Sequence, residues 1–163
     1  MTNRLDVHGL FPRFDLVGKE VGVSRWITLD QQRITDFGRI TEDEDPMHVD
    51  PQWAASHSPY ESTISFGFLT LSMLTTMINE LIARPADEVA SLNYGFDKIR
   101  MLSPVRAGKR VRGHLVLAEL ELRKPDQFRS RYQVTVEVEG EDKPALYAEW
   151  LTLTNVREPR VPA

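Results

Sequence analysis

The stretch that most constrains the fold of this chain is 67–83, GFLTLSMLTTMINELIA. Its apolar positions are Phe68, Leu69, Leu71, Met73, Leu74, Met77, Ile78, Leu81 and Ile82. On a helix these side chains cover most of the circumference, and a helix that is apolar nearly all round is buried. Arg84, which precedes a proline, should end it. About sixteen residues span only about 24 Å, too short for a membrane crossing. The rest of the chain must therefore provide a cover for this helix.

The chain after residue 85 has the pattern of β-strands. Apolar and polar side chains alternate, between turn residues, over 91–101, 110–122, 128–138 and 145–156. In the first of these segments Leu92, Tyr94 and Phe96 share one phase of the alternation. Four successive strands with short connections form an antiparallel sheet. A sheet this small hides such a helix only by curling around it. The predicted fold is therefore α+β, a curved antiparallel sheet wrapped around a long central helix, which is the hot-dog fold.

Two shorter elements begin the ordered part of the chain. The β-branched and aromatic residues of 21–29 predict a first strand. Asp30 is then an N-cap for a short helix over 31–39, in which Ile34 and Phe37 lie on one face. A strand and a helix therefore lead into the acidic segment that follows.

Asp50, followed by a proline, predicts another short helix, because aspartate is a preferred N-cap and proline suits the first helical position. This helix should cover 51–56 and turn Trp53 and Ala54 inward. The next residues, 58–65, are rich in turn formers and should be irregular.

The segment 37–50, FGRITEDEDPMHVD, concentrates side chains that can carry chemistry. Residues 42–45 are carboxylates in succession, and His48 follows after a proline. A carboxylate and an imidazole held a few residues apart on a loop suit general acid–base chemistry near neutral pH. The alternative is a solvated acidic loop with an incidental histidine, since short charge runs mostly lie at the surface.

Composition limits the classes of function. A chain of 163 residues suits one domain, here with a lead-in arm over 1–20 and a flexible tail over 157–163. The net charge of −4 argues against non-specific nucleic-acid binding, and the lack of cysteine excludes disulfides and thiolate chemistry. His57 and His114 have no spaced partner, so we expect no metal site. No secretory signal and no membrane-length apolar run is visible, which predicts a cytoplasmic protein.

Three stretches share the order and spacing of a known family. In TEDEDPMH, Asp43 is followed five residues later by His48 across a proline. A glycine opens the central helix within 62–74, STISFGFLTLSML, and 93–113, NYGFDKIRMLSPVRAGKRVRG, supplies a pair of strands. Together they resemble the MaoC-like (R)-specific enoyl-CoA hydratases, and the third stretch is similar to the nodulation-protein-N-like branch of that family.

The resemblance implies a lyase that adds water to the 2,3 double bond of an enoyl-CoA thioester, or removes it, with R specificity. It also implies a homodimer, a place in fatty acid metabolism, and no cofactor beyond the coenzyme A of the substrate. The hot-dog fold leaves two alternatives, an acyl-CoA thioesterase or a catalytically weak acyl-thioester-binding subunit. Serine-hydrolase chemistry is disfavoured because the chain has no GxSxG motif.

The resemblance assigns the catalytic roles to Asp43, His48 and Gly67. The first two would hold one water, and the residues alone do not decide which of them is the base. Gly67 opens the buried helix, where unpaired backbone N–H groups and the helix dipole can stabilise the negative charge that develops on a thioester oxygen. A glycine there allows close approach of a ligand, although it is equally a plain start of a helix.

The predicted substrate-binding residues are Asp45, Tyr60, Ser65, Phe66, Arg100, Arg106 and Lys109. Asp45 stands where many relatives carry asparagine and adds negative charge beside the site. Phe66 stands where the family usually has histidine and removes a polar group. With Arg110 and Arg112 the three basic residues form a cluster on the strand pair; some of the cluster would meet the phosphates of coenzyme A, or it belongs to a solvated strand face.

Overall fold

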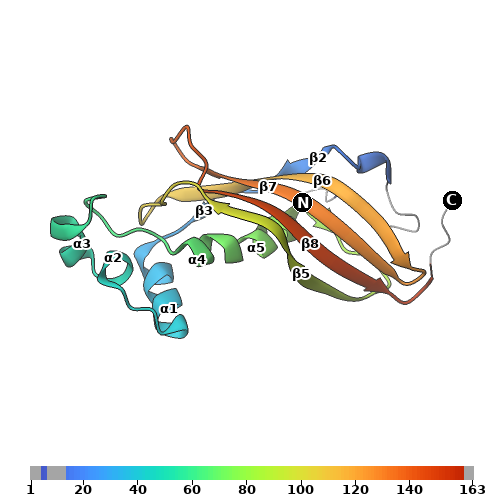
Figure 1. Cartoon of the computed structure of the whole chain (residues 1–163), viewed down its shortest axis with the longest axis horizontal. Helices are drawn as coiled ribbons and strands as arrows, with labels where there is room; N and C mark the ends of the chain where they lie inside the picture. Colours follow the sequence, from blue (N-terminus) through green and yellow to red (C-terminus); the bar gives the residue numbers. More distant parts are fainter. Residues whose placement is uncertain (1–4, 7–13, 160–163) are drawn as a thin grey trace.

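The computed structural model describes residues 5–6 and 14–159, and its main feature is a curved sheet (Figure 1). Its long strands are β5 (Glu88–Met101), β6 (Arg110–Lys124), β7 (Gln127–Val138) and β8 (Leu146–Val156). The strand order is β2-β6-β7-β8-β5, and the long strands pair antiparallel to their neighbours. The four predicted strands and the antiparallel sheet are confirmed.

The predicted first strand is split into β2 (Glu20–Val23) and β3 (Ile27–Thr28), both of which pair with β6. Ser24 lies at the break. Its N–H donates to the carbonyl of Gly113 at 2.9 Å, and its Oγ accepts from the Gly113 N–H at 2.9 Å. At this point the two hydrogen bonds between buried Ser24 and Gly113 therefore take the place of regular strand pairing.

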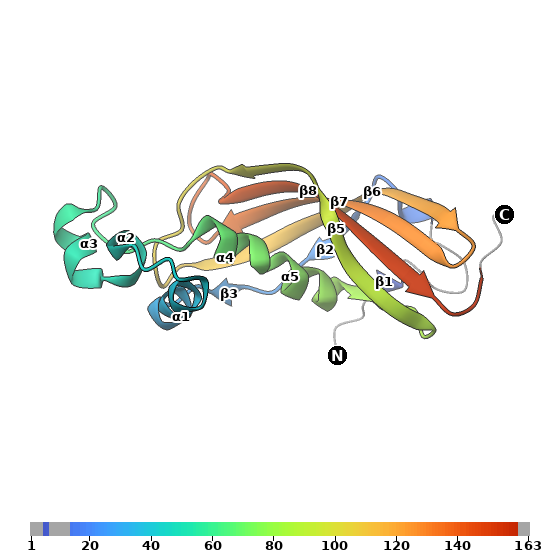
Figure 2. The same ribbon diagram turned by 60° about the horizontal axis from the view of Figure 1, so that its bottom comes forward.

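The central helix lies along the concave face of the sheet (Figures 1 and 2). It consists of α4 (Gly67–Ser72) and α5 (Leu74–Leu81), separated by a turn at Met73. Leu74 and Met77 are buried against the sheet. A Cβ on Gly113 of β6 would lie 2.8 Å from the sulfur of Met77, so the close packing of helix on sheet requires glycine at that position.

The prediction that this helix is covered all round is wrong. Phe68 is 70% exposed, and Ser72 and Thr75 are exposed as well. The sheet covers only one side of the helix, because it ends at the edge strand β5. One flank of the helix, next to β5, therefore stays open.

The prediction that Leu92, Tyr94 and Phe96 share a face is also wrong. Register shifts interrupt the pairing of β5 with β8 after Asn93 and after Phe96. Phe96 packs on Trp150 on the concave face of the sheet, whereas Leu92 and Tyr94 are each 53% exposed. Bulges of this kind depend on the partner strand and leave no simple signal in the sequence.

Three short helices form a cap at one end of the sheet (Figure 2). They are α1 (Gln31–Thr41), α2 (Pro46–Val49) and α3 (Pro51–His57). The predicted N-caps are confirmed, because Asp30 accepts from Arg33 N at 2.8 Å and Asp50 accepts from Gln52 N at 2.9 Å. The prediction missed α2. It was right that Ala54 is buried but wrong for Trp53, which is 37% exposed and stacks on His57 at the surface.

Two described segments near the ends of the chain contact residues between 82 and 87. β1 (Leu5–Asp6) pairs parallel to β4 (Ile82–Ala83), and a short 3-10 helix covers Phe14–Leu16. The predicted arm is therefore not wholly irregular, although most of it lies outside the described residues. The tail is anchored at its start, where Arg157 N donates to Asp87 O at 2.9 Å; residues 160–163 lie outside the described part. Within the described residues no helix is long and apolar enough to cross a membrane.

Candidate active site

A pocket of about 730 Å³, partly open to solvent, lies at the start of α4. It is lined by His48, Tyr60, Ile64, Ser65, Gly67, Thr70, Met101, Leu102, Ser103, Pro104, Val105 and Ala145. Four predicted site residues, contributed by α2, the irregular loop and α4, therefore share one pocket. We call it the catalytic pocket, after the roles predicted for His48 and Gly67.

The tautomer of His48 follows from a single hydrogen bond. Its Nδ1 lies 2.7 Å from the carbonyl oxygen of Ile64, and a carbonyl can only accept, so Nδ1 carries the hydrogen. In the neutral imidazole the other nitrogen, Nε2, then has a free lone pair. No group among the described residues forms a hydrogen bond with Nε2. The imidazole at the catalytic pocket can therefore accept a proton.

The short helix α2 holds His48 in this position. Asp45 is its N-cap, with Oδ1 accepting from Met47 N at 2.8 Å. The carbonyl of Met47 accepts from Ile64 N at 3.2 Å. Together with the bond from His48 to the Ile64 carbonyl, this gives two hydrogen bonds between α2 and the loop, one donated from each side. The Asp45 side chain is exposed and does not line the catalytic pocket. The structure thus gives Asp45 a capping contact in place of the predicted contact with substrate.

Asp43 lies at the end of α1 and is exposed. It follows Glu42, which ends the helix with a positive φ of 58°. The Asp43 N–H donates to the carbonyl of Gly38 at 2.9 Å, which ties the backbone there to α1. Asp43 does not line the catalytic pocket, so the structure does not bring it to His48 in the way it brings Gly67.

Gly67 is the first residue of α4, where backbone N–H groups have no partner within the helix. The N-cap residue, Phe66, makes no side-chain cap, so these donors are not satisfied by that route. A Cβ at Gly67 would lie 3.1 Å from the sulfur of Met101. Glycine is therefore favoured here by a close neighbour, which sequence alone does not reveal.

Phe66 is buried behind the catalytic pocket and does not line it. Its ring lies 3.9 Å from the His48 ring and 5.2 Å from that of Phe37, measured between centroids. It belongs to a small core with Ile34 and Leu69. Phe66 therefore supports the imidazole from behind, and the structure does not bring it to the predicted place against the substrate. Ser65 is buried at the pocket wall, and its Oγ donates to the carbonyl of Phe66 at 3.1 Å.

A second pocket, of about 670 Å³ and also partly open, adjoins the first, because Tyr60, Ser103 and Pro104 line both. Its other lining residues are Arg106, Lys109, Val138, Glu141 and Lys143. Lys109 pairs with Glu141 at 3.1 Å, whereas Arg106 and Lys143 form no ion pair with any described residue. Two predicted cations and one missed cation, Lys143, therefore gather beside the catalytic pocket. The basic residue in the turn 140–144 was the available signal for Lys143.

Arg100 is not brought to these pockets. It lies in a separate surface hollow with Lys98 and Tyr147, and its guanidinium donates to the carbonyl of Ile99 at 2.8 Å. Arg100 pairs across the ladder with Tyr147, whose neighbours along β8 face the core. The predicted contact of Arg100 with substrate is therefore not supported by its position.

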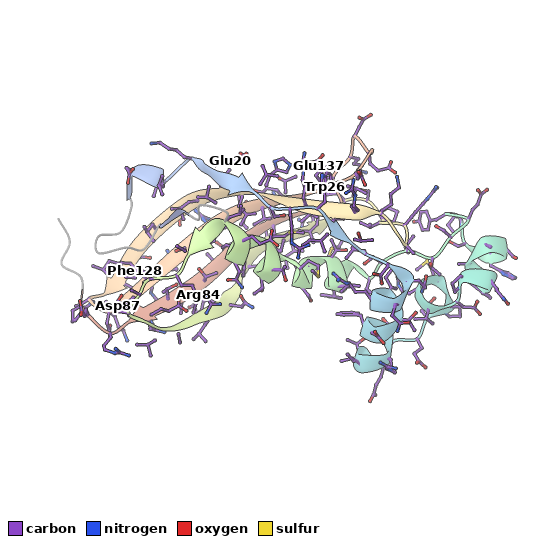
Figure 3. The ribbon with its side chains drawn as sticks, turned by 180° about the vertical axis from the view of Figure 1, so that it is seen from behind. Glu20, Trp26, Arg84, Asp87, Phe128 and Glu137 are labelled. Carbon is purple, nitrogen blue, oxygen red and sulfur yellow. The ribbon has the colours of Figure 1, made fainter. Side chains whose placement is uncertain are left out.

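Further along the strand pair, Arg112 belongs to an ion-paired outer face. Its Nε donates to Glu137 at 2.7 Å, and its guanidinium lies 4.4 Å from the ring centroid of Trp26 (Figure 3). The hydrogen bond from Arg112 is the main cause that lowers the pKa of Glu137, followed by the one from His114. Arg110 pairs with Glu139 in the same way. For these two arginines the interpretation as a solvated strand face holds.

Nothing in the described part of the chain gathers three histidine, cysteine or carboxylate side chains that could hold a metal ion. The catalytic pocket itself is lined by an imidazole with a free nitrogen and by the start of a helix. Proton transfer and stabilisation of an oxyanion are what these groups can supply.

Residues 14–141 match the family described as MaoC like domain. A relative, nodulation protein N of Rhizobium meliloti (strain 1021), is 45% identical over 138 residues, which cover 85% of this chain and 86% of that protein. The 3-hydroxyacyl-thioester dehydratase Z of Mycobacterium tuberculosis is 37% identical over 132 residues, 81% of this chain and 86% of the other. Among solved structures, the (R)-hydratase from A. caviae involved in PHA biosynthesis has a TM-score of 0.67 at 20% identity, covering 90% of this chain and 96% of that one. The hot-dog fold is confirmed.

Proposed function

The chain belongs to the MaoC-like dehydratase family, and we propose that it hydrates the 2,3 double bond of an enoyl-CoA thioester, with R specificity, or catalyses the reverse dehydration. The observation that carries this proposal is that His48, whose Nε2 is free, and Gly67 at the start of α4 line one pocket. The dehydratase activity for which the Mycobacterium tuberculosis relative is named, and the hydratase activity of the structurally similar A. caviae protein, agree with it. A place in fatty acid metabolism and a cytoplasmic location both stay predictions.

In the proposed hydration, His48 Nε2 accepts a proton from water as the water oxygen bonds to the β-carbon of the substrate. Electrons of the double bond move toward the thioester, and the N–H groups at Gly67 stabilise the resulting enolate oxygen. The proton then passes to the α-carbon, which restores the neutral imidazole. Asp43 is proposed to accept a hydrogen bond from the second O–H of the water, which stays on the oxygen in the product, since catalytic hydrogen bonds often form only with substrate bound.

We assign the second pocket to the phosphates of coenzyme A. Arg106 and Lys143 present cations without an internal partner, next to the pocket where the thioester would react. Arginine and lysine are the usual ligands of phosphate groups. Changing both to alanine should raise KM for a CoA thioester by about tenfold, with less effect on a substrate that ends at the pantetheine thiol, which lacks these phosphates.

The test of the proposed reaction is incubation with crotonyl-CoA and measurement of the loss of enoyl-thioester absorbance, with chiral analysis of the 3-hydroxyacyl product. Hydration that is lost in His48→Gln supports the proposal. Release of free coenzyme A would instead indicate a thioesterase. Binding without turnover, across several acyl lengths, would indicate an acyl-thioester-binding subunit.

We also propose a homodimer that pairs β5 with β5 of a second copy. β5 is an edge strand of fourteen residues, and long unprotected edges are normally covered. Apolar side chains are exposed along it and on the adjacent helix flank, with Val89 at 64%, Leu92 at 53% and Phe68 at 70%. Pairing of two such edges would cover these side chains and continue the sheet across both copies.

A further inference from the structure

The concave face of the sheet has two chemically different halves. Beneath α4 it is apolar, with Val134, Val136, Leu146 and Ala148 all fully buried. Beneath the end of α5 polar side chains join the apolar Phe128 and Val156, and we call this the polar half; its polar and amphipathic residues are Ser91, Asn93, Ser130, Tyr132, Trp150, Thr152 and Thr154. The inner face of a sheet that only packs on a helix is expected to be apolar throughout. The polar half therefore needs an explanation other than packing.

A chamber of about 620 Å³, partly open to solvent, occupies this polar half. Its walls come from α5, from the segment 82–85 and from the inner residues of the sheet. It lies at the end of the molecule away from the cap helices, where Figure 3 labels Arg84. The chamber is thus separate from the catalytic pocket but lies on the same side of the sheet.

Trp150 lines the chamber and is only 2% exposed, yet its indole Nε1–H has no hydrogen-bond partner among the described residues. Buried polar groups normally have partners, because an unpaired donor costs free energy. The neighbouring Tyr132 is fully buried, and burial raises its pKa to about 12, slightly opposed by Ser130, so its hydroxyl stays a neutral donor. The chamber therefore offers donors that a bound ligand could satisfy.

A groove extends from the chamber along the open flank of the helix toward the start of α4. Phe68, Leu71 and Thr75 line it on the helix side, and it shares Thr75, Asn93 and Trp150 with the chamber. From Gly67 to the level of the chamber the helix advances twelve residues, about 18 Å. A long acyl chain whose thioester lies at Gly67 could reach the chamber along this groove.

The charge at the chamber favours a neutral ligand group. Arg84 and Glu88 both line it, and they pair with each other at 3.3 Å. The remaining polar lining residues are hydroxyls, amides and the indole, which carry no net charge. A carboxylate at the end of the acyl chain would have no unpaired cation among these lining residues to bind, whereas a hydroxyl or keto oxygen could accept hydrogen bonds from the donors.

We propose that the chamber binds a hydroxyl or keto oxygen on the distal part of the acyl chain, so that the enzyme prefers long thioesters with an oxygenated tail to plain alkyl ones. This inference rests on the proposed function for its kinetic consequence. The recognition itself rests on the unpaired indole N–H and on the polar wall of Thr152, Thr154 and Asn93.

The kinetic test compares kcat/KM for two enoyl-CoA substrates of equal length, one with a distal hydroxyl or keto group and one without. We expect at least a tenfold preference for the oxygenated chain. Trp150→Phe, which keeps a ring but removes the N–H, and Thr152→Val should each lower this ratio severalfold. Thr135→Val is the matched control, because Thr135 lies on the outer face of the same sheet and should leave the ratio unchanged.

Crotonyl-CoA separates the two proposals, because its chain is too short to reach the chamber. Hydration of crotonyl-CoA together with equal use of the two long substrates would overturn the inference and leave the proposed function intact. If no thioester is hydrated, calorimetric binding of the two saturated acyl-CoA thioesters still decides. Tighter binding of the oxygenated chain, weakened by Trp150→Phe, supports the chamber, and equal affinities would reject it.

Discussion

At the scale of single residues, the bond between His48 and Ile64 determines how the imidazole can act. With Nδ1 donating to a backbone carbonyl, only Nε2 is left to exchange a proton. We expect His48→Gln to lower kcat/KM by about a hundredfold to ten-thousandfold, the usual range for losing a general base. His57→Gln is the control, since His57 is exposed on α3 and lines neither pocket. Similar rates for the two variants in an absorbance assay would contradict the assignment.

The second residue-scale prediction concerns Gly67. In Gly67→Ala the new methyl group would meet Met101, at 3.1 Å from its sulfur, and would also crowd the first N–H groups of α4. Met101 is 46% exposed and flexible, so unfolding free energy should fall by about 1 kcal/mol or less. The rate should drop far more, about a hundredfold, because a displacement of about 1 Å at a reacting group costs that much.

The double variant Gly67→Ala with Met101→Ala separates packing from catalysis. Removing the Met101 side chain makes room for the new methyl group and should restore any lost stability, measured by chemical denaturation. The rate should stay low if the methyl group blocks approach of the thioester to the backbone. Recovery of the rate together with the stability would mean that Gly67 serves packing alone.

At the scale of elements, α2 links a capping residue to the candidate base. Asp45→Ala should cost about 1 kcal/mol of stability through loss of the cap. Since α2 also carries His48, activity should fall about tenfold or more. Asp50→Ala is the matched control, because it removes the cap of α3, which carries no pocket residue. Equal losses of activity in the two variants would show that α2 does not position His48.

The ion-paired ladder between β6 and β7 predicts a pH dependence. Hydrogen bonds from Arg112, first, and His114 lower the pKa of Glu137 below its ordinary value of 4.5. The unfolded chain then binds more protons between the two pKa values, so stability rises with pH across that window. The stabilisation that the ionised Glu137 gives to the folded state is complete above about pH 4.5, and it is lost as pH falls through the lowered pKa of Glu137 in the folded state.

Glu137→Gln should therefore reduce stability above pH 5 and flatten the dependence of the unfolding free energy on pH below it, measured by denaturant titration at several pH values. Glu44→Gln is the control, because Glu44 is exposed and forms no ion pair with any described residue. An unchanged slope in Glu137→Gln would show that the pairing contributes nothing to folding.

Local patterns were enough to predict the four long strands, the N-caps Asp30 and Asp50, and the hot-dog arrangement of helix and sheet. The family resemblance, rather than local pattern, assigned roles to His48 and Gly67, which do line one pocket. What failed depends on contacts between distant segments. The bulges in β5 are set by its pairing with β8, and the break at Ser24 by contact with β6. The position of Asp43 depends on how α1 ends, which the acidic run does not reveal.

At the scale of the whole molecule, the two ends of the central helix have different roles. The start of α4 lines the pocket proposed for the thioester, which the pocket proposed for the phosphates adjoins, whereas the end of α5 covers the polar chamber. The groove on the open helix flank extends from the chamber toward the start of α4 and runs beside the edge strand β5 (Figure 2). A second copy placed against β5 would therefore also cover the groove, and dimer formation should affect how the acyl chain binds.

The proposed dimer predicts that a charge in the middle of the β5 edge separates the two copies. Leu92 is 53% exposed there. A lysine in its place would be buried at the paired edge, close to the same lysine of the second copy, and charges of this kind keep strand edges apart. We expect light scattering at micromolar concentration to give a dimeric mass for the natural chain and a monomeric mass for Leu92→Lys. Ile40→Lys is the control, since Ile40 is 78% exposed but lies on α1, away from β5. A monomeric mass for the unaltered chain would contradict the proposal, and so would a dimer that Leu92→Lys leaves intact, because that dimer would use another surface.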